Sequence, residues 1–384
     1  MHIFYIVEEV YLMHESKHGF FKIAITIVII IIIVSIIAYS IWIGSSDKKV
    51  YLKGSGASFP YPLIQTLINK YKNINPSVRI DYASVGSGAG QADLLNMVVD
   101  FAGSDAPLTD EQLSSAPGWI LHIPYTLGAV VIAYNIPGSS EDLKLTPELI
   151  VLIFGGKISR WNDERLVEYN PWLNDINKSI TVIHRSDASG TTWIFTTFLS
   201  RETSFWREHF GAGKTIAWPN LDRFIGGKGN EGVTGLIKQT PYSIGYVEFT
   251  YAYKEGIAMA SVRNRVGIFI KPSVDSISKA AAVNISNLDP RDLRISRFVI
   301  DSNVSDAYPI SSCTYFLVYE DWSVYDGQPN VIKYKAKAFK EWVIWILNEG
   351  VKYYKELGYA PIPSSLKSKV IEALNLISYK GSRL

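Results

Sequence analysis

Hydrophobic and polar positions follow two alternating periods in the chain after residue 49. Val78, Ile80 and Tyr82 occupy every second position, which predicts a strand with one buried face. The segment before it has apolar residues at helical spacing, namely Leu63, Ile64, Leu67, Ile68 and Tyr71. The succession of strand, glycine-rich turn and helix recurs along the chain, and this predicts an α/β fold.

Longer apolar runs predict further strands. A buried strand is expected in "GAVVIAYNIP" at 128–137, another strand in "YSIGYVEFTYAY" at 242–253, and a third in "AYPISSCTYFLVYE" at 307–320. Cys313 lies in the third run and is the only cysteine of the chain, so we expect a buried thiol and no internal disulfide.

Three further segments have the length and periodicity of helices, at 147–154, 193–199 and 335–358. The last is amphipathic, with an apolar face formed by Phe339, Val343, Ile346 and Leu347. This face predicts a long helix that packs on the core.

Residues 23–43 are the strongest compositional feature. These 21 residues carry no charge, and twelve of them are isoleucine. As a helix they would reach roughly 31 Å, which matches the core of a bilayer. We therefore predict a membrane anchor at 23–43, a cytoplasmic segment at 1–22, and the bulk of the chain on the extracytoplasmic side. A signal peptide cleaved near "AYS" at 38–40 is the alternative, although its apolar region would be long.

The charge balance and the histidines exclude several functions. A formal net charge of +2 does not fit a broad nucleic-acid surface, so no nucleic-acid partner is expected. His122, His184 and His209 follow the apolar segment, and they show neither the spacing of metal ligands nor that of a catalytic triad. We therefore predict no metal site, no cofactor and no catalytic residue.

Four turns rich in glycine and hydroxyls each precede an expected helix. They are "GSGASF" at 54–59, "SVGSGAG" at 84–90, "GSDAP" at 103–107 and "RSDASGTT" at 185–192. A helix N-terminus offers unpaired N–H groups and partial positive charge, glycine permits close approach, and hydroxyls add donors. One such turn is commonly a plain N-cap, but four together predict a shared site for a small oxyanion.

Arg185 and Asp105 suggest which oxyanion. The guanidinium of Arg185 matches an oxyanion bidentately, and Asp187 stands two residues on, where it can hold that guanidinium. A carboxylate repels sulfate, which has no proton at neutral pH, whereas phosphate keeps a proton that a carboxylate accepts. Asp105 therefore favours phosphate over sulfate, unless it serves only as an N-cap.

Two segments of the chain match enzyme motifs in part, but each lacks a required glycine. A nucleophile elbow requires G-x-S-x-G, but Asp187 stands where the first glycine belongs. The "GAGKT" at 211–215 lacks the first glycine of a P-loop, because position 208 is Glu208, and no strand precedes it.

In this order and spacing, the segments resemble the phosphate-binding proteins of ABC-type phosphate importers. The resemblance runs from about Leu52 to about Ala373 and rests on "GSGASFP", "SVGSGAG", "DFAGSDAPLT", "RSDASGTTWIFTTFLS", "GGKGNEGV", "SIGYVEFTYA" and "AYPISSCTYFLV". It implies a two-lobed periplasmic-binding-protein fold of the two-crossover class, with dehydrated phosphate in the cleft between the lobes. Lobe one would comprise 50–126 plus 254–384, and lobe two 127–253.

The resemblance also implies a set of phosphate-binding residues: Ser58, Phe59, Ser87, Asp105, Arg185, Asp187, Ser189, Gly190 and Thr191. Ser58 stands where the family commonly has threonine, and it keeps the hydroxyl. Asp105 would accept the phosphate proton, Arg185 would be the one cationic ligand, and Asp187 would orient it. The other six would give hydroxyl or backbone donors.

The implied partner is an ABC permease, to which a monomeric, membrane-tethered protein delivers inorganic phosphate. Two other functions stay open from the residues. One is the binding of another oxyanion, such as sulfate, molybdate or tungstate. The other is a phosphate-ester hydrolase on the same fold, which would need a metal cluster or an activated nucleophile.

Overall fold

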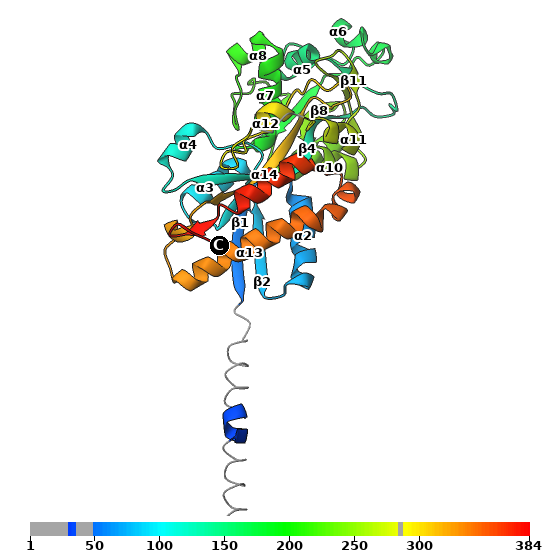
Figure 1. The fold of residues 1–384 in the computed structure, drawn as a ribbon. Coiled ribbons are helices and arrows are strands. Elements are labelled where there is room, and N and C mark those ends of the chain that lie inside the picture. The colour runs from blue at the N-terminus through cyan, green and yellow to red at the C-terminus, as the bar shows by residue number, and fades with distance from the viewer. Residues whose placement is uncertain (1–29, 36–48, 283–286) are drawn as a thin grey trace, which may run out of the picture. The chain divides into compact units, whose positions relative to one another are not determined.

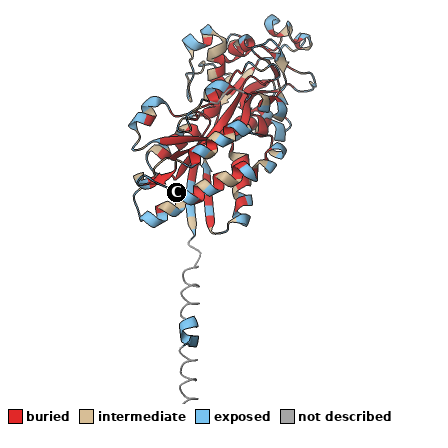
Figure 2. Ribbon diagram, in the orientation of Figure 1, coloured by how far each residue is buried: buried red, intermediate tan, exposed pale blue. Residues whose placement is uncertain are grey.

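The computed structural model describes residues 30–35, 49–282 and 287–384. Val50–Leu384 form one unit in which helices pack around a central sheet (Figure 1). The strands of this sheet are largely buried (Figure 2). Residues 30–35 are helical.

The secondary structure alternates between strands and helices, as the pattern predicts. The central sheet contains β1 (Val50–Gly56), β2 (Val78–Ser84), β3 (Phe101–Ser104), β4 (Ile120–Asn135), β6 (Thr181–Arg185), β7 (Phe224–Gly227), β8 (Ser243–Glu248), β9 (Ala258–Met259), β12 (Ser311–Tyr319) and β13 (Ala360–Pro361). Two small sheets contain β5 (Lys144–Leu145), β10 (Ser261–Arg263) and β11 (Phe269–Ile270), and β14 (Ser378–Tyr379) and β15 (Ser382–Arg383). The helices are α2 (Tyr61–Ile74), α3 (Ser87–Leu95), α4 (Asp110–Ser115), α5 (Pro147–Phe154), α6 (Glu164–Val167), α7 (Gly190–Glu202), α8 (Ser204–His209), α9 (Gly229–Gln239), α10 (Phe249–Lys254), α11 (Val274–Lys279), α12 (Ser296–Val299), α13 (Pro329–Asn348) and α14 (Ser364–Leu374).

The long strand β4 joins the two halves of the sheet. The main strand order is β2-β1-β3-β12-β4-β8-β6-β7. The first part of β4 pairs with β12 and its last part pairs with β8. Within each half three strands run parallel, β1 with β2 and β3, and β6 with β7 and β8. Each half therefore has one edge where three carboxyl ends meet, and ligands of α/β sheets bind outside such edges.

The hydrophobic core confirms the predicted faces. Leu63, Ile64, Leu67 and Tyr71 of α2 are buried, and the predicted face of α13 is buried as well. An aromatic cluster lies under α13, where the rings of Phe101 and Trp342 have centroids 5.5 Å apart. Cys313 is buried in β12, as predicted.

Three predicted elements have different bounds in the structure. The segment 242–253 is a strand only as far as Glu248, because the Glu248 carboxylate accepts the N–H of Thr250 and caps α10. The helix predicted at 335–358 begins at Pro329 and ends at Asn348, where 3₁₀ turns follow. The helix after β2 starts at Ser87, inside the glycine turn, so that turn is itself the helix N-terminus.

The predicted membrane span at 23–43 lies outside the described residues apart from 30–35. In the ranges that the structure describes, no helix has the length and apolar character needed to cross a membrane. The lobe boundaries stay a prediction. The boundary predicted at residue 254 places β9 and β10 in lobe one. In the structure, β9 pairs with β4 and β10 pairs with β5. These two short strands therefore lie beside strands of the predicted lobe two.

Gly90 lets α3 sit directly on β1, and its replacement tests this packing. A Cβ at Gly90 would clash with the Cα of Gly56 and lie 2.8 Å from the carbonyl oxygen of Ser55. We expect Gly90→Ala to lower the free energy of unfolding by about 1–3 kcal/mol in urea denaturation. The matched control is Gly235→Ala in α9, where a Cβ meets nothing within 4 Å. This variant should be more stable by up to about 1 kcal/mol, and equal stability of the two variants would contradict the packing argument.

Candidate functional site

The predicted site residues gather at the carboxyl ends of the parallel strands. Ser58 and Phe59 follow β1, Ser87 begins α3 after β2, and Asp105 follows β3. In the other half, Arg185 is the last residue of β6. Asp187 and Ser189 follow in the turn, and Gly190 and Thr191 begin α7.

Arg185 is a buried cation whose orientation is fixed. Its relative exposure is 4%. Its Nε and Nη2 atoms donate to the two carboxylate oxygens of Asp187 at 2.8 and 2.5 Å, and Nη1 donates to Thr191 Oγ1 at 3.1 Å. The backbone N–H of Gly229 also donates to Asp187, at 3.1 Å. Burial raises the pKa of Asp187, but these bonds and the charge of Arg185 outweigh it and lower the pKa overall.

Asp105 is a buried carboxyl group in the opposite half. Its Oδ1 accepts a hydrogen bond from Thr314 at 2.8 Å, and its Oδ2 accepts a long one of 3.3 Å from Ser87. Burial raises the pKa of Asp105 to about 7, and the bonds from Thr314 and Ser87 and the charge of Arg185 only partly oppose it. This group is therefore an acceptor whose ionisation falls near neutral pH.

The N-terminus of α7 contacts Asp105 through Gly190. Ser189 is the N-cap, and its hydroxyl accepts the N–H of Thr192 at 3.1 Å. A Cβ at Gly190 would clash with Ser87 Oγ and lie 2.6 Å from Asp105 Oδ2. Only glycine lets the free N–H groups of this helix start approach the carboxyl group so closely.

Further contacts join the two halves around the site. The N–H of Gly88 donates to the carbonyl oxygen of Ala188 at 2.9 Å. The ammonium group of Lys214 donates to the side chain of Gln91. The Tyr251 hydroxyl donates to the carbonyl oxygen of Ser58 at 2.7 Å. The loops that carry the predicted residues therefore face one another in a closed arrangement.

Asn230 is a buried residue in contact with the predicted site, and the sequence analysis did not identify it. Its backbone N–H and its Nδ2 donate to Ser58 Oγ at 3.1 and 3.0 Å, and Nδ2 also lies 3.2 Å from Thr191 Oγ1. The signal was present, because "GGKGNEG" is a further glycine turn before a helix. Lys228 in that turn carries the charge that an anion site would favour, but its side chain is exposed.

Phe59 offers only its backbone to the predicted site. Its side chain is fully buried, and its carbonyl oxygen accepts the Tyr359 hydroxyl at 2.7 Å. The Tyr359 hydroxyl also lies 3.5 Å from the buried carboxylate of Glu248. Phe59 is thereby held by the core, which leaves its N–H as the group available to a ligand.

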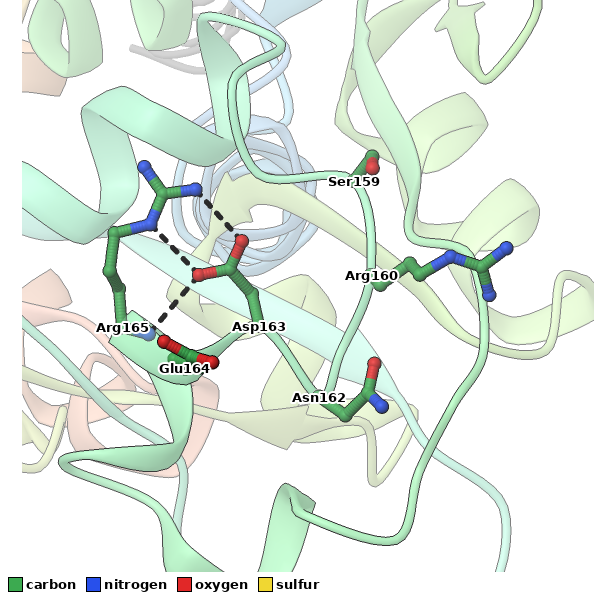
Figure 3. A pocket seen from close by; sticks show the side chains of 6 residues that line it. All are labelled: Ser159, Arg160, Asn162, Asp163, Glu164 and Arg165. Carbon is green, nitrogen blue, oxygen red and sulfur yellow. Dashed lines mark hydrogen bonds and ion pairs between the residues drawn. The ribbon is translucent and has the colours of Figure 1, made fainter.

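A surface pocket of about 500 Å³ is a competing place for an anion. Figure 3 shows the side chains that line it, Ser159, Arg160, Asn162, Asp163, Glu164 and Arg165. Arg165 donates to both carboxylate oxygens of Asp163 at 2.8 Å, while the Arg160 side chain points away from this pair (Figure 3). Arg160 Nη1 donates to Asn177 Oδ1 at 2.8 Å. The Arg165 side chain is 47% exposed, so water screens its charge. This pocket is the weaker candidate.

His122 and His184 make contacts within the fold. His122 is buried, and its Nε2 accepts the N–H of Leu108 at 3.0 Å. Burial lowers the pKa of His122 to about 3, so its ring is neutral. His184 stacks on Trp218. Among residues 30–35, 49–282 and 287–384, no group of three or more His, Cys, Asp or Glu side chains has the arrangement of a metal site.

Comparison with known proteins gives first the class and then the family. Residues 44–347 match the PBP superfamily domain. The chain is 37% identical over 348 residues to the phosphate-binding protein PstS of Methanocaldococcus jannaschii, covering 87% of this chain and 88% of that protein. It is 36% identical over 321 residues to PstS of Haemophilus influenzae, covering 83% and 91%. The fold matches that of the phosphate-binding protein from Stenotrophomonas maltophilia with a TM-score of 0.60 at 20% identity, over 84% and 93% of the chains. The chain belongs to the PstS family of phosphate-binding proteins.

The pKa of Asp105 predicts how stability depends on pH. Its pKa is higher in the folded protein, about 7, than its ordinary value of 3.8, so ionisation costs the folded state free energy. In phosphate-free protein this cost is absent below about pH 4 and complete above about pH 7. Compared with wild type, Asp105→Asn should gain on the order of 2–4 kcal/mol of unfolding free energy between pH 4 and pH 8. Guanidinium denaturation at both pH values measures this difference, and a difference that does not change with pH would contradict the argument.

Proposed function

We propose that this protein binds inorganic phosphate in the cleft between two lobes and delivers it to an ABC permease. The observation that carries the proposal is the contact of Gly190 with Asp105. It brings the donor-rich start of α7, with Arg185 beside it, against a buried acceptor. A set of donors with one acceptor suits an oxyanion that keeps a proton. The names of the relatives, which are phosphate-binding proteins, support the same ligand.

Each residue has a role that follows from its chemistry. Arg185 supplies the positive charge, and Asp187 holds its guanidinium so that little ordering is needed on binding. Asp105 accepts the proton of phosphate. Donors complete the site, from the hydroxyls of Ser58, Ser87, Ser189 and Thr191 and from the N–H groups of Phe59, Ser87, Gly190 and Thr191. Hydrogen bonds to charged groups are worth about 1.5–3 kcal/mol each, but the loss of hydration opposes them.

Lobe closure belongs to the proposed mechanism. Lobe one would comprise 50–126 plus 254–384 and lobe two 127–253, which assigns Ser58 and Asp105 to one lobe and Arg185 to the other. Phosphate that bonds both sets favours the closed state, because only there does it have all its partners. The protein is a substrate-binding protein rather than an enzyme, and we expect it to act as a monomer.

We further propose that the bulk of the chain acts outside the cytoplasm and that residues 23–43 tether it to the membrane. The support is the uncharged, isoleucine-rich composition of that segment, which has the length of a bilayer span. Cell fractionation of the full chain tests the tether. Recovery in the membrane fraction after a high-salt wash supports it, and complete release of a shortened chain contradicts it.

Arg185→Ala tests the cation. Loss of the guanidinium removes a charged donor and leaves the Asp187 carboxylate without its partner, so phosphate affinity should fall at least about 100-fold. Isothermal titration of protein stripped of carried-over phosphate measures this. The matched control is Arg165→Ala in the surface pocket, whose Kd should stay within about twofold of wild type. A larger loss for Arg165→Ala than for Arg185→Ala would move the site to that pocket.

Asp105→Asn tests the choice of oxyanion. Wild type should bind phosphate and give no sulfate response, because the carboxylate repels an anion that has no proton to donate. The amide of the variant can donate to sulfate, so the ratio of sulfate to phosphate affinity should rise about tenfold or more. Competition titrations at pH 8, where the carboxyl group is mainly ionised, measure the ratio. An unchanged ratio would mean that Asp105 serves the fold alone.

A further inference from the structure

Asn230 lies between two hydroxyls that come from different halves of the molecule. It is the second residue of α9 and is fully buried. Its Oδ1 accepts the backbone N–H of Glu248 at 2.9 Å. Because a backbone N–H can only donate, this bond fixes the orientation of the amide and aims Nδ2 at Ser58 and Thr191.

Both hydroxyls have their acceptor capacity filled by N–H groups. A hydroxyl has one hydrogen to donate and two lone pairs to accept with. Ser58 Oγ accepts from the backbone N and the Nδ2 of Asn230. Thr191 Oγ1 accepts from Arg185 Nη1 and from Asn230 Nδ2. Within 49–282 and 287–384, no hydrogen bond takes the hydrogen of either hydroxyl, so each is free to point at a ligand.

We propose that Asn230 is a positioning residue that makes Ser58 and Thr191 obligate hydrogen-bond donors toward the bound anion. The proposal rests on the proposed phosphate-binding function. With both lone pairs occupied, these hydroxyls cannot accept a proton from the ligand. Neither hydroxyl can then take over from Asp105 the recognition of that proton, which sharpens the distinction between anions that carry a proton and anions that do not.

A competing role for Asn230 is a purely structural one, in which its hydrogen bonds only hold the two halves together. The variants Asn230→Asp and Asn230→Ala separate the two roles. In Asn230→Asp, a carboxylate oxygen replaces Nδ2, and the two hydroxyls can donate to it instead of to the ligand. The bonds between the halves persist, but their direction is reversed. In Asn230→Ala the bonds from the side chain are lost and no acceptor replaces them.

The test is the Kd of inorganic phosphate at pH 8, from isothermal titration of stripped protein. Asn230→Ala should weaken binding about tenfold, and Asn230→Asp about 100-fold or more. Each variant is then measured again with Ser58→Ala and with Thr191→Val. The extra loss of Asn230→Asp should shrink at least about threefold in each background, since there is one hydroxyl fewer to misdirect.

Two results would overturn the proposal. If Asn230→Asp binds phosphate as tightly as Asn230→Ala does, only the structural role of Asn230 remains. If the loss of phosphate affinity in Asn230→Asp is equally large with Ser58→Ala and with Thr191→Val, the cause is repulsion by the new charge. Failure of wild type to bind phosphate at all is a separate result, and it would overturn the proposed function itself.

Asn135→Asp is the matched control for the integrity of α9. Asn135 Nδ2 donates to the carbonyl oxygens of Ile237 and Lys238 at 2.9 and 3.2 Å, at the other end of this helix. The same chemical change there should leave the phosphate Kd within about twofold of wild type. A loss equal to that of Asn230→Asp would assign the effect to a loosened helix and would also overturn the proposal. Thermal unfolding of each variant confirms that folded protein is being compared.

Discussion

Desolvation of charge is the constraint on which the rest of this structure depends. Arg185 and Asp105 are both buried, and a buried ionisable group is stable only when the protein replaces its hydration. Asp187 and Thr191 do this for Arg185. The partners of Asp105 do not fully offset its burial, so its pKa stays raised and the carboxylate accepts a proton more readily. The contrast between a buried cation held by Asp187 and a buried carboxyl group with a raised pKa is the electrostatic basis of the proposed phosphate site.

Small residues make this electrostatic arrangement possible. Gly190 brings the start of α7 against Asp105, and Gly90 brings α3 against β1. At Gly86, whose φ is +90°, a Cβ would lie 2.6 Å from an Asp187 carboxylate oxygen. Each glycine therefore marks a place where two backbones, or a backbone and a carboxylate, approach more closely than a side chain permits. From the sequence these glycines could be assigned to predicted anion-binding turns, but the groups that they approach could not be named.

Much of the candidate site could be predicted because its signals are local. A strand followed by a small-residue turn and a helix fixes where N–H groups and hydroxyls are presented, and this applies to the turns that contain Ser58, Ser87 and Thr191. Asn230 could not be ranked above Lys228 in this way. Its importance comes from a contact with Ser58, 172 residues away in sequence, which no local pattern encodes. The break at Glu248 was missed for a related reason, because β-propensity continued through a segment that a single buried cap turned into a helix.

The sequence by itself determined the α/β class, the order of the elements and the buried faces of α2 and α13, because hydrophobic periodicity and turn chemistry act over a few residues. It also determined the apolar character of residues 23–43. Only the tertiary structure decided which turns face each other, which hydroxyls have their lone pairs occupied, and which carboxyl group keeps a raised pKa. These properties depend on the pairing of β4 with both β12 and β8, which brings distant segments together. Hydrogen-bond direction and burial are set by such neighbours, and they exist only after the chain has folded.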